Sequence, residues 1–192
     1  MNEDSYPGSL LVRLGFGWEE HAREHMWESY EAFFEGKAPY GLRVNIFQAR
    51  GLPSADPNGL LDPYVKVRFC GSKKKTKVKK ATADPHFYQM LEFAEMLPYD
   101  PESGKQLKEL MPEVILQVWD RDVVGKNTQV AGMRLAMPEC YFTRSATSKA
   151  PAPKWYPLQD TNGEAGDFGE LLVSVQLIAK RTVKERFPTP AP

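Results

Sequence analysis

The stretch Leu52-Pro-Ser-Ala-Asp56-Pro-Asn-Gly-Leu-Leu-Asp62-Pro-Tyr-Val-Lys-Val-Arg-Phe69 decides the fold of this chain. Its second half alternates with a period of two, apolar at Val65, Val67 and Phe69 and charged at Lys66 and Arg68. Such alternation is typical of a strand with one buried and one solvent-facing side. The first half is rich in proline and contains an Asn-Gly pair, which favours a loop. The stretch therefore predicts an acidic loop that leads into a half-buried strand.

The same period-two pattern recurs along the rest of the chain. The expected strands are 42–46, 65–69, 76–80, 90–96, 114–119, 130–136, 155–158 and 171–178. Turn signals such as Asp84-Pro85 and Asn162-Gly163 separate them. About eight short strands with polar connections predict an all-β, antiparallel sandwich of two sheets.

The chain divides into an arm over residues 1–40, a body over 41–181 and a proline-rich tail over 182–192. The arm contains a strand-like apolar run at 10–14. After it, apolar residues recur at helical spacing from Trp18 to Phe34. We expect an amphipathic helix over about 18–35, capped by Gly36. Its apolar stripe would cover either the flank of the body or a protein partner.

Composition narrows the function classes. The 192 residues contain 25 Lys+Arg and 25 Asp+Glu, and a net charge of zero argues against a generic nucleic-acid binder. Two cysteines without a diagnostic spacing favour a reduced, cytoplasmic compartment. No apolar run reaches the ~20 residues that span a bilayer, and the acidic start MNEDSYPG is no secretory signal. We expect any membrane contact to be peripheral, and the chain is compatible with being one piece of a larger protein.

Two acidic clusters lie at strand ends. The first contains Asp56 and Asp62, and the second contains Asp120 and Asp122 directly after the strand 114–119. Calcium takes 6 to 8 oxygen ligands from flexible loops, so two such loops at one end of a sandwich would supply four carboxylates. Backbone carbonyls would complete the site, with Ala55 and Arg121 as the expected donors. The alternative is ordinary turn chemistry, since Asp side chains bond their own backbone.

These loops resemble a known family. The stretch 52–67 is similar to the first calcium loop of C2 domains, and Val118-Trp-Asp-Arg-Asp122 is similar to the third. Ala83-Asp-Pro-His-Phe87 resembles the Asn-Pro-x-Trp segment of the same family. The resemblance implies an eight-stranded C2-type β-sandwich that binds Ca²⁺ and anionic phospholipids.

The end of the body extends the resemblance. Trp155-Tyr-Pro-Leu158 and the strand 169–178 are similar to the ferlins, multi-C2 proteins of vesicle fusion and membrane repair. A closing strand without an equivalent before Leu42 implies the circularly permuted type II topology, unless 10–14 supplies an early strand.

The third loop departs from the family pattern. Where C2 domains usually carry a fifth Asp, this chain has Asn127, Thr128 and Gln129. Fewer charged ligands mean weaker binding, so we expect about one or two calcium ions, with Asn127 as a neutral ligand. Calcium independence remains an open alternative. If the carboxylates do cluster, their repulsion means that calcium should also stabilise the fold.

Apolar residues lie at the predicted loop tips. Leu60 and Leu61 are in the first loop, and Val123 and Val124 are in the third. Beside a cation site, such side chains are suited to insertion into a bilayer. The alternative is that Leu61 or Val123 packs beneath its own loop.

A basic hairpin follows the first loop. No acidic residue lies between Asp62 and Asp84, whereas eight Lys and Arg residues do. Alternation places the following residues on one outer face: Lys66, Arg68, Lys75, Lys77 and Lys79. C2 domains often bind phosphoinositides through these two strands, and the resemblance implies that role here. The alternative is a solvated edge protected from aggregation by lysines.

One motif suggests an enzyme. His21-Ala-Arg-Glu24-His25 fits the H-x-x-E-H zinc-protease pattern, with the histidines as ligands and Glu24 as general base. No downstream helix offers a third ligand, and the pattern arises easily in an acidic helix, so we expect no catalytic activity.

Taken together, the residues and the resemblance predict calcium-dependent binding to anionic phospholipid membranes. The expected setting is the cytosolic face of a vesicle or plasma membrane, in docking, fusion or repair within a ferlin-like protein. The alternative is a calcium-independent module that binds phosphoinositide or protein, with the helix 18–35 as a partner surface.

Overall fold

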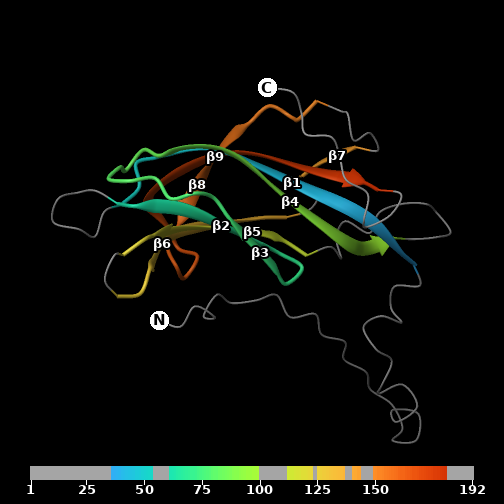
Figure 1. The fold of residues 1–192 in the computed structure, drawn as a ribbon, viewed down its shortest axis with the longest axis horizontal. Helices are drawn as coiled ribbons and strands as arrows, with labels where there is room; N and C mark the ends of the chain where they lie inside the picture. The colour runs from blue at the N-terminus through green and yellow to red at the C-terminus, as the bar shows by residue number, and fades with distance from the viewer. Residues whose placement is uncertain are drawn as a thin grey trace, which may run out of the picture.

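The computed structural model describes residues 36–53, 61–99, 112–122, 125–136, 140–143 and 149–180 (Figure 1). Nine strands lie in these ranges: β1 Gly36–Arg50, β2 Pro63–Phe69, β3 Ser72–Lys75, β4 His86–Tyr99, β5 Val114–Asp120, β6 Thr128–Leu135, β7 Tyr141–Thr143, β8 Lys154–Gln159 and β9 Ala165–Ala179. The strand expected at 10–14 and the helix expected at 18–35 lie outside the described residues.

The strands follow the hydrogen-bonded order β3-β2-β5-β6-β8-β9-β1-β4. Neighbours on this path are antiparallel, and only the short β7 adds a parallel pairing, to β9, among the described strands. A single residue pair, Gly132 with Gln159, joins β6 to β8. The path therefore has two four-stranded halves, and Figure 1 shows β1, β4 and β9 over β2, β5 and β6. This confirms the predicted all-β antiparallel sandwich; the type II topology stays a prediction.

The two halves enclose one apolar core, which the period-two alternation builds. The inward side chains of β1 are Leu42, Val44 and Ile46, each at most 1% exposed. Phe69 of β2 and Phe93 of β4 meet edge to face, with ring centroids 6.2 Å apart. Each fully buried side chain of this kind contributes about 1.5 to 3 kcal/mol relative to exposure.

The strand expected at 76–80 is wrong, because regular pairing ends at Lys75. Thr76 turns inward and accepts a hydrogen bond from the Val65 N–H through its Oγ1, at 2.9 Å. Three backbone N–H groups then donate to the chain before and within β2: Thr76 to Val65, Lys79 to Pro63 and Thr82 to Leu61. The segment therefore advances three residues for every two of its partner, which no regular ladder permits.

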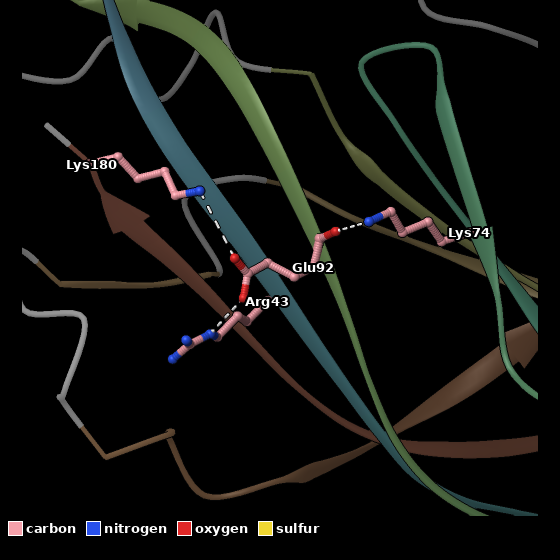
Figure 2. A network of polar contacts seen from close by, with 4 residues as sticks. All are labelled: Arg43, Lys74, Glu92 and Lys180. Carbon is pink, nitrogen blue, oxygen red and sulfur yellow. Dashed lines mark hydrogen bonds and ion pairs between the residues drawn. The ribbon is translucent and has the colours of Figure 1, made fainter. Parts of the chain in front are cut away.

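Side chains tie the two ends of the strand path together. Lys74 of β3 donates through Nζ to the carbonyl of Glu92 in β4, as Figure 2 shows. Ser72 donates to the Glu95 carboxylate at 2.8 Å. An edge strand presents unpaired backbone groups that invite aggregation, so these contacts cover part of the exposed edge of β4.

The Glu92 side chain links β4 to β1 and to the residue that follows β9. Its carboxylate lies 3.2 Å from Arg43 Nε in β1 and 3.9 Å from Lys180 Nζ just after β9 (Figure 2). The Arg43 and Lys180 side chains are 3% and 2% exposed. Buried charges require pairing, and this carboxylate supplies a shared partner for both.

Gly169 in β9 lies close against the backbone at the end of β1. Its φ is +80°, and a Cβ there would collide with the carbonyls of Arg50 and Gly51, lying 2.6 Å from the latter oxygen. We expect Gly169→Ala to lower the free energy of unfolding by about 3 kcal/mol, from the left-handed backbone cost plus the clash. Urea denaturation followed by circular dichroism measures this.

Gly163 is the matched control, because its φ is +87° and its Cβ position is open to within 4.0 Å. Gly163→Ala should therefore cost only the backbone term of about 1 to 2 kcal/mol. Equal losses in the two variants would contradict the close approach of β9 to the end of β1.

Candidate functional site at the loop end and the basic face

Two of the four predicted carboxylate ligands of calcium, Asp62 and Asp120, are neighbours. Asp120 ends β5 and pairs with Pro63 at the start of β2. The Asp62 N–H donates to Asp120 Oδ1 at 2.7 Å, and the Arg121 N–H donates to the Asp62 carbonyl at 3.1 Å. Asp120 is only 7% exposed. The end of the first loop and the end of β5 are thus fastened together by hydrogen bonds in both directions.

Two further ligand candidates, Asp122 and Asn127, make other contacts. Asp122 Oδ2 accepts a long 3.5 Å bond from the Thr128 hydroxyl. The Asn127 amide donates to the Tyr64 hydroxyl at 3.3 Å. Asp56 and Ala55 lie outside the described residues.

The donor chemistry suits a hard cation only in part. Within the described part of the chain, no three Asp, Glu, His or Cys side chains converge on one point that could hold a metal. Asp62 and Asp120 supply oxygen ligands of the type that calcium prefers, but two carboxylates fall short of its usual 6 to 8 oxygens. A calcium site here needs Asp56, Asp122 and backbone carbonyls as well, so it stays a proposal.

Leu61 corrects one of the predicted membrane-inserting residues. It is 2% exposed and belongs to the apolar core. Its carbonyl accepts the Thr82 N–H at 2.9 Å, which holds this end of the loop against the sheet. Leu60, Val123 and Val124 lie outside the described residues and stay predictions.

The basic face on β2 and β3 consists of the outward side chains Lys66, Arg68, Lys73 and Lys75. Lys66 pairs directly with Lys75, and Arg68 pairs with Lys73. Cross-strand partners project on the same side of a sheet, which confirms that Lys66 and Lys75 share a face. Lys73 was not among the predicted binding residues and joins them through this register.

Two aromatic rings support the ammonium groups of this face. Lys66 Nζ lies 3.7 Å from the centroid of the Trp119 ring, and Lys75 Nζ lies 5.4 Å from that of Tyr64. Both are cation–π distances. The rings are 5% and 3% exposed, so they form a floor beneath the lysines rather than a free surface. The ammonium groups of two neighbouring lysines therefore each lie over an aromatic ring.

Sequence reasoning did not identify this aromatic floor, although a signal was present. Tyr64 precedes Lys66 by two residues and so shares its face. Trp119 is the register partner of Tyr64 on β5. Applying the alternation to Tyr64 as well as to the lysines would have placed the rings beneath the charges.

The remaining predicted lysines lie beyond the regular strand. The Lys77 N–H donates to Gln89 Oε1 at 2.8 Å, and the Lys79 N–H donates to the Pro63 carbonyl at 2.9 Å. Lys77 is exposed and Lys79 is half-buried. Lys74 lies on the opposite side of β3, with Nζ 5.4 Å from the Phe93 ring centroid. Of the consecutive lysines 73 to 75, only the outer two therefore belong to the basic face.

Cys70 lies at the turn between β2 and β3. The residue is exposed to solvent, but partial desolvation of its thiol by neighbouring atoms, and secondarily the nearby negative charge of Glu95, raise its pKa to about 12. Reactive cysteines have a lowered pKa, so this thiol is not suited to nucleophilic or redox chemistry.

The raised pKa makes thiol labelling strongly pH-dependent. A thiol of pKa about 12 is protonated at neutral pH. A thiol-specific reagent should therefore react with Cys70 far more slowly in the folded chain than in the urea-unfolded chain. Below that pKa, each added unit of pH should raise the rate about tenfold while the chain stays folded. Cys70→Ser identifies its share of the signal, and labelling at the rate of the urea-unfolded chain would contradict the raised pKa.

The H-x-x-E-H pattern at 21–25 lies outside the described residues. No helix in the part of the chain that the structure covers has the length and hydropathy to cross a bilayer.

Comparison with known proteins places these observations in a family. The C2 domain family profile matches residues 40–158. Myoferlin of Xenopus tropicalis is 33% identical over 150 residues, which is 78% of this chain and 7% of that protein. The chain thus spans a small fraction of that relative's length.

Solved structures share the fold. A C2 domain of plant Extended Synaptotagmin 1 superposes with a TM-score of 0.53 at 22% identity, over 74% of this chain and 96% of that one. The calcium-bound pair of C2 domains of Extended-Synaptotagmin 2 gives a TM-score of 0.52 at 17% identity, over 72% and 45%. At these identities the likeness concerns the fold alone.

Proposed function

Since this chain belongs to the C2 domain family, we propose that it binds anionic phospholipid membranes through its basic face. The observation that carries the proposal is the direct pairing of Lys66 with Lys75 above the aromatic floor. Two adjacent ammonium groups on one face are suited to a phosphate that bears more than one negative charge. Phosphoinositide headgroups are such ligands.

Several basic residues acting together would bind an anionic membrane more strongly than any one of them alone. Near an anionic leaflet each Lys or Arg contributes about 1 kcal/mol. The predicted set of Lys66, Arg68, Lys75, Lys77 and Lys79, extended by Lys73, would together hold a domain at the surface. The cation–π contacts reduce the rotamer freedom of Lys66 and Lys75, which lowers the entropy cost of binding.

The double variant Lys66→Gln, Lys75→Gln tests the basic face. Loss of two charges at about 1 kcal/mol each should weaken binding to phosphoinositide-containing vesicles about thirtyfold. Co-sedimentation with liposomes measures the change. Because glutamine keeps most of the side-chain length, folding should be unaffected.

Lys149 and Lys154 provide the matched control, since both are exposed and lie away from β2 and β3. Lys149→Gln, Lys154→Gln removes the same net charge and should change binding by less than about threefold, the long-range effect alone. A control that loses as much affinity as the first variant would mean that net charge, not the basic face, drives binding.

Calcium forms the second part of the proposal. Asp62 and Asp120 are joined at the loop end, and we propose that calcium bridges them, with Asp56 and Asp122, to lipid phosphate. The carbonyls of Ala55 and Arg121 and the amide of Asn127 are the proposed additional donors. Leu60, Val123 and Val124 would then enter the bilayer beside the ion.

Calcium linkage tests this part without any membrane. A ligand that binds only the folded chain stabilises it by about 2.7 kcal/mol at a hundredfold excess over Kd. We therefore expect saturating calcium to raise Tm by about 5 to 10 °C, and Asp120→Asn, Asp122→Asn to abolish the shift. Scanning calorimetry in calcium and in chelator provides the measurement, with magnesium as the control ion.

An unchanged Tm in the unmodified chain would favour the calcium-independent alternative. Two observations support that alternative: no three Asp, Glu, His or Cys side chains converge among the described residues, and a neutral residue stands where a fifth Asp is usual. In that case the basic face acts alone, or the helix predicted at 18–35 binds a protein.

The proposed setting is the cytosolic face of a vesicle or plasma membrane, where the chain would serve docking, fusion or repair as part of a ferlin-like protein. The similarity to myoferlin supports this setting.

A further inference from the structure

The residues after β3 form a second basic element, the basic segment 77–80, which contains Lys77, Lys79 and Lys80. It has no regular strand pairing, yet it continues directly from the basic face. Its position therefore depends on individual contacts rather than on a sheet ladder.

One of these contacts comes from a predicted calcium ligand. The Ala81 N–H, directly after the segment, donates to Asp62 Oδ1 at 3.0 Å. Backbone bonds from Lys79 to the Pro63 carbonyl and from Thr82 to the Leu61 carbonyl flank it, both at 2.9 Å. Asp62 is thus the side-chain member of a short series of bonds that holds the segment to the start of β2.

The backbone conformation of Ala81 gives the hydrogen bond to Asp62 a structural role. Its φ is +51°, a left-handed conformation that costs an L residue about 1 to 2 kcal/mol. Such a conformation persists where surrounding contacts determine it. The charged acceptor on Asp62 supplies one, since hydrogen bonds to charged groups are stronger than neutral ones.

A further hydrogen bond links Asp62 to the end of β5. Asp62 is itself held by its N–H bond to Asp120 Oδ1, at 2.7 Å. The chain of bonds therefore runs from the buried end of β5, through Asp62, to the end of the basic segment.

From this arrangement we propose that Asp62 is a positioning residue for the basic segment, fixing its lysines for lipid phosphate whether or not calcium is bound. The proposal deepens the function proposed above and rests on it. It separates two roles of one carboxylate: one oxygen bonds Ala81, while the negative charge serves a cation.

Asp62→Asn and Asp62→Ala separate the two roles. Asparagine keeps an oxygen that can accept the Ala81 N–H but removes the charge, whereas alanine removes both. In chelator, Asp62→Asn should bind phosphoinositide-containing vesicles within about twofold of the unmodified chain, while Asp62→Ala should bind at least about fivefold more weakly. Equal binding by all three chains would overturn the proposal.

Amide hydrogen exchange on the protein alone gives an independent readout. The Ala81 amide should exchange at least about tenfold faster in Asp62→Ala but not in Asp62→Asn, because one hydrogen bond of about 1.4 kcal/mol is lost. The Leu116 and Val118 amides of β5 should stay protected, which shows that the fold is intact. Unchanged exchange at Ala81 in Asp62→Ala would show that the Asp62 side chain does not hold the segment. Faster exchange with undiminished vesicle binding would overturn the positioning role.

If Asp62→Ala does not fold, adding Ala81→Gly restores stability, since glycine adopts the φ of +51° at no steric cost. The double variant still lacks the Asp62 acceptor, so it should weaken binding in chelator by a similar factor. Full binding by the double variant would count against the proposal. Failure of the unmodified chain to bind in chelator would instead refute the calcium-independent part of the proposed function, and the exchange result would still decide whether Asp62 holds the segment.

Discussion

The hydrogen bond from the Asp62 N–H to the buried Asp120 carboxylate is the contact on which the loop end depends. A carboxylate that is 7% exposed requires strong partners, and this N–H is one. The bond sets the end of the first loop against the end of β5, while the Arg121 N–H returns a bond to the Asp62 carbonyl. β2, β3 and the basic segment follow directly after this contact in the sequence.

Charge is used in two distinct ways around that point. At the loop end, acidic side chains accept backbone N–H bonds and so organise the chain. On β2 and β3, basic side chains adjoin across the strand pair, and Lys66 and Lys75 lie over aromatic rings. Like charges directly opposite each other on a strand pair are destabilising. A bound anion would relieve this repulsion, which is why we propose a phosphate-bearing ligand for the basic face.

The period-two alternation of the sequence predicted the sandwich, because it directly encodes which side chains enter the core. It also predicted that Lys66 and Lys75 share a face. It failed at 76–80, where the alternation continues but Thr76 replaces a ladder bond with its own hydroxyl. Side-chain competition for backbone groups leaves no period in a sequence, and the three-residue β7 is too short to show one.

The site was predicted less completely than the fold, for a similar reason. The carboxylate spacing indicated that Asp62 and Asp120 meet, but not that each would accept a backbone N–H. Leu61 was assigned to a loop tip from its neighbours in sequence, whereas its burial depends on packing against distant strands. The structure leaves Asp56 and the tips at Leu60, Val123 and Val124 as predictions from sequence.

We propose that the folded chain recognises anionic phospholipid surfaces. The most direct measurement is co-sedimentation of the unmodified chain with neutral, phosphatidylserine and phosphoinositide vesicles across a range of salt concentrations, in calcium and in chelator. We expect binding to anionic vesicles alone, strongest with phosphoinositide, weakened by salt and enhanced by calcium. Binding that is absent from all vesicles, or equal on neutral and anionic ones, would contradict it.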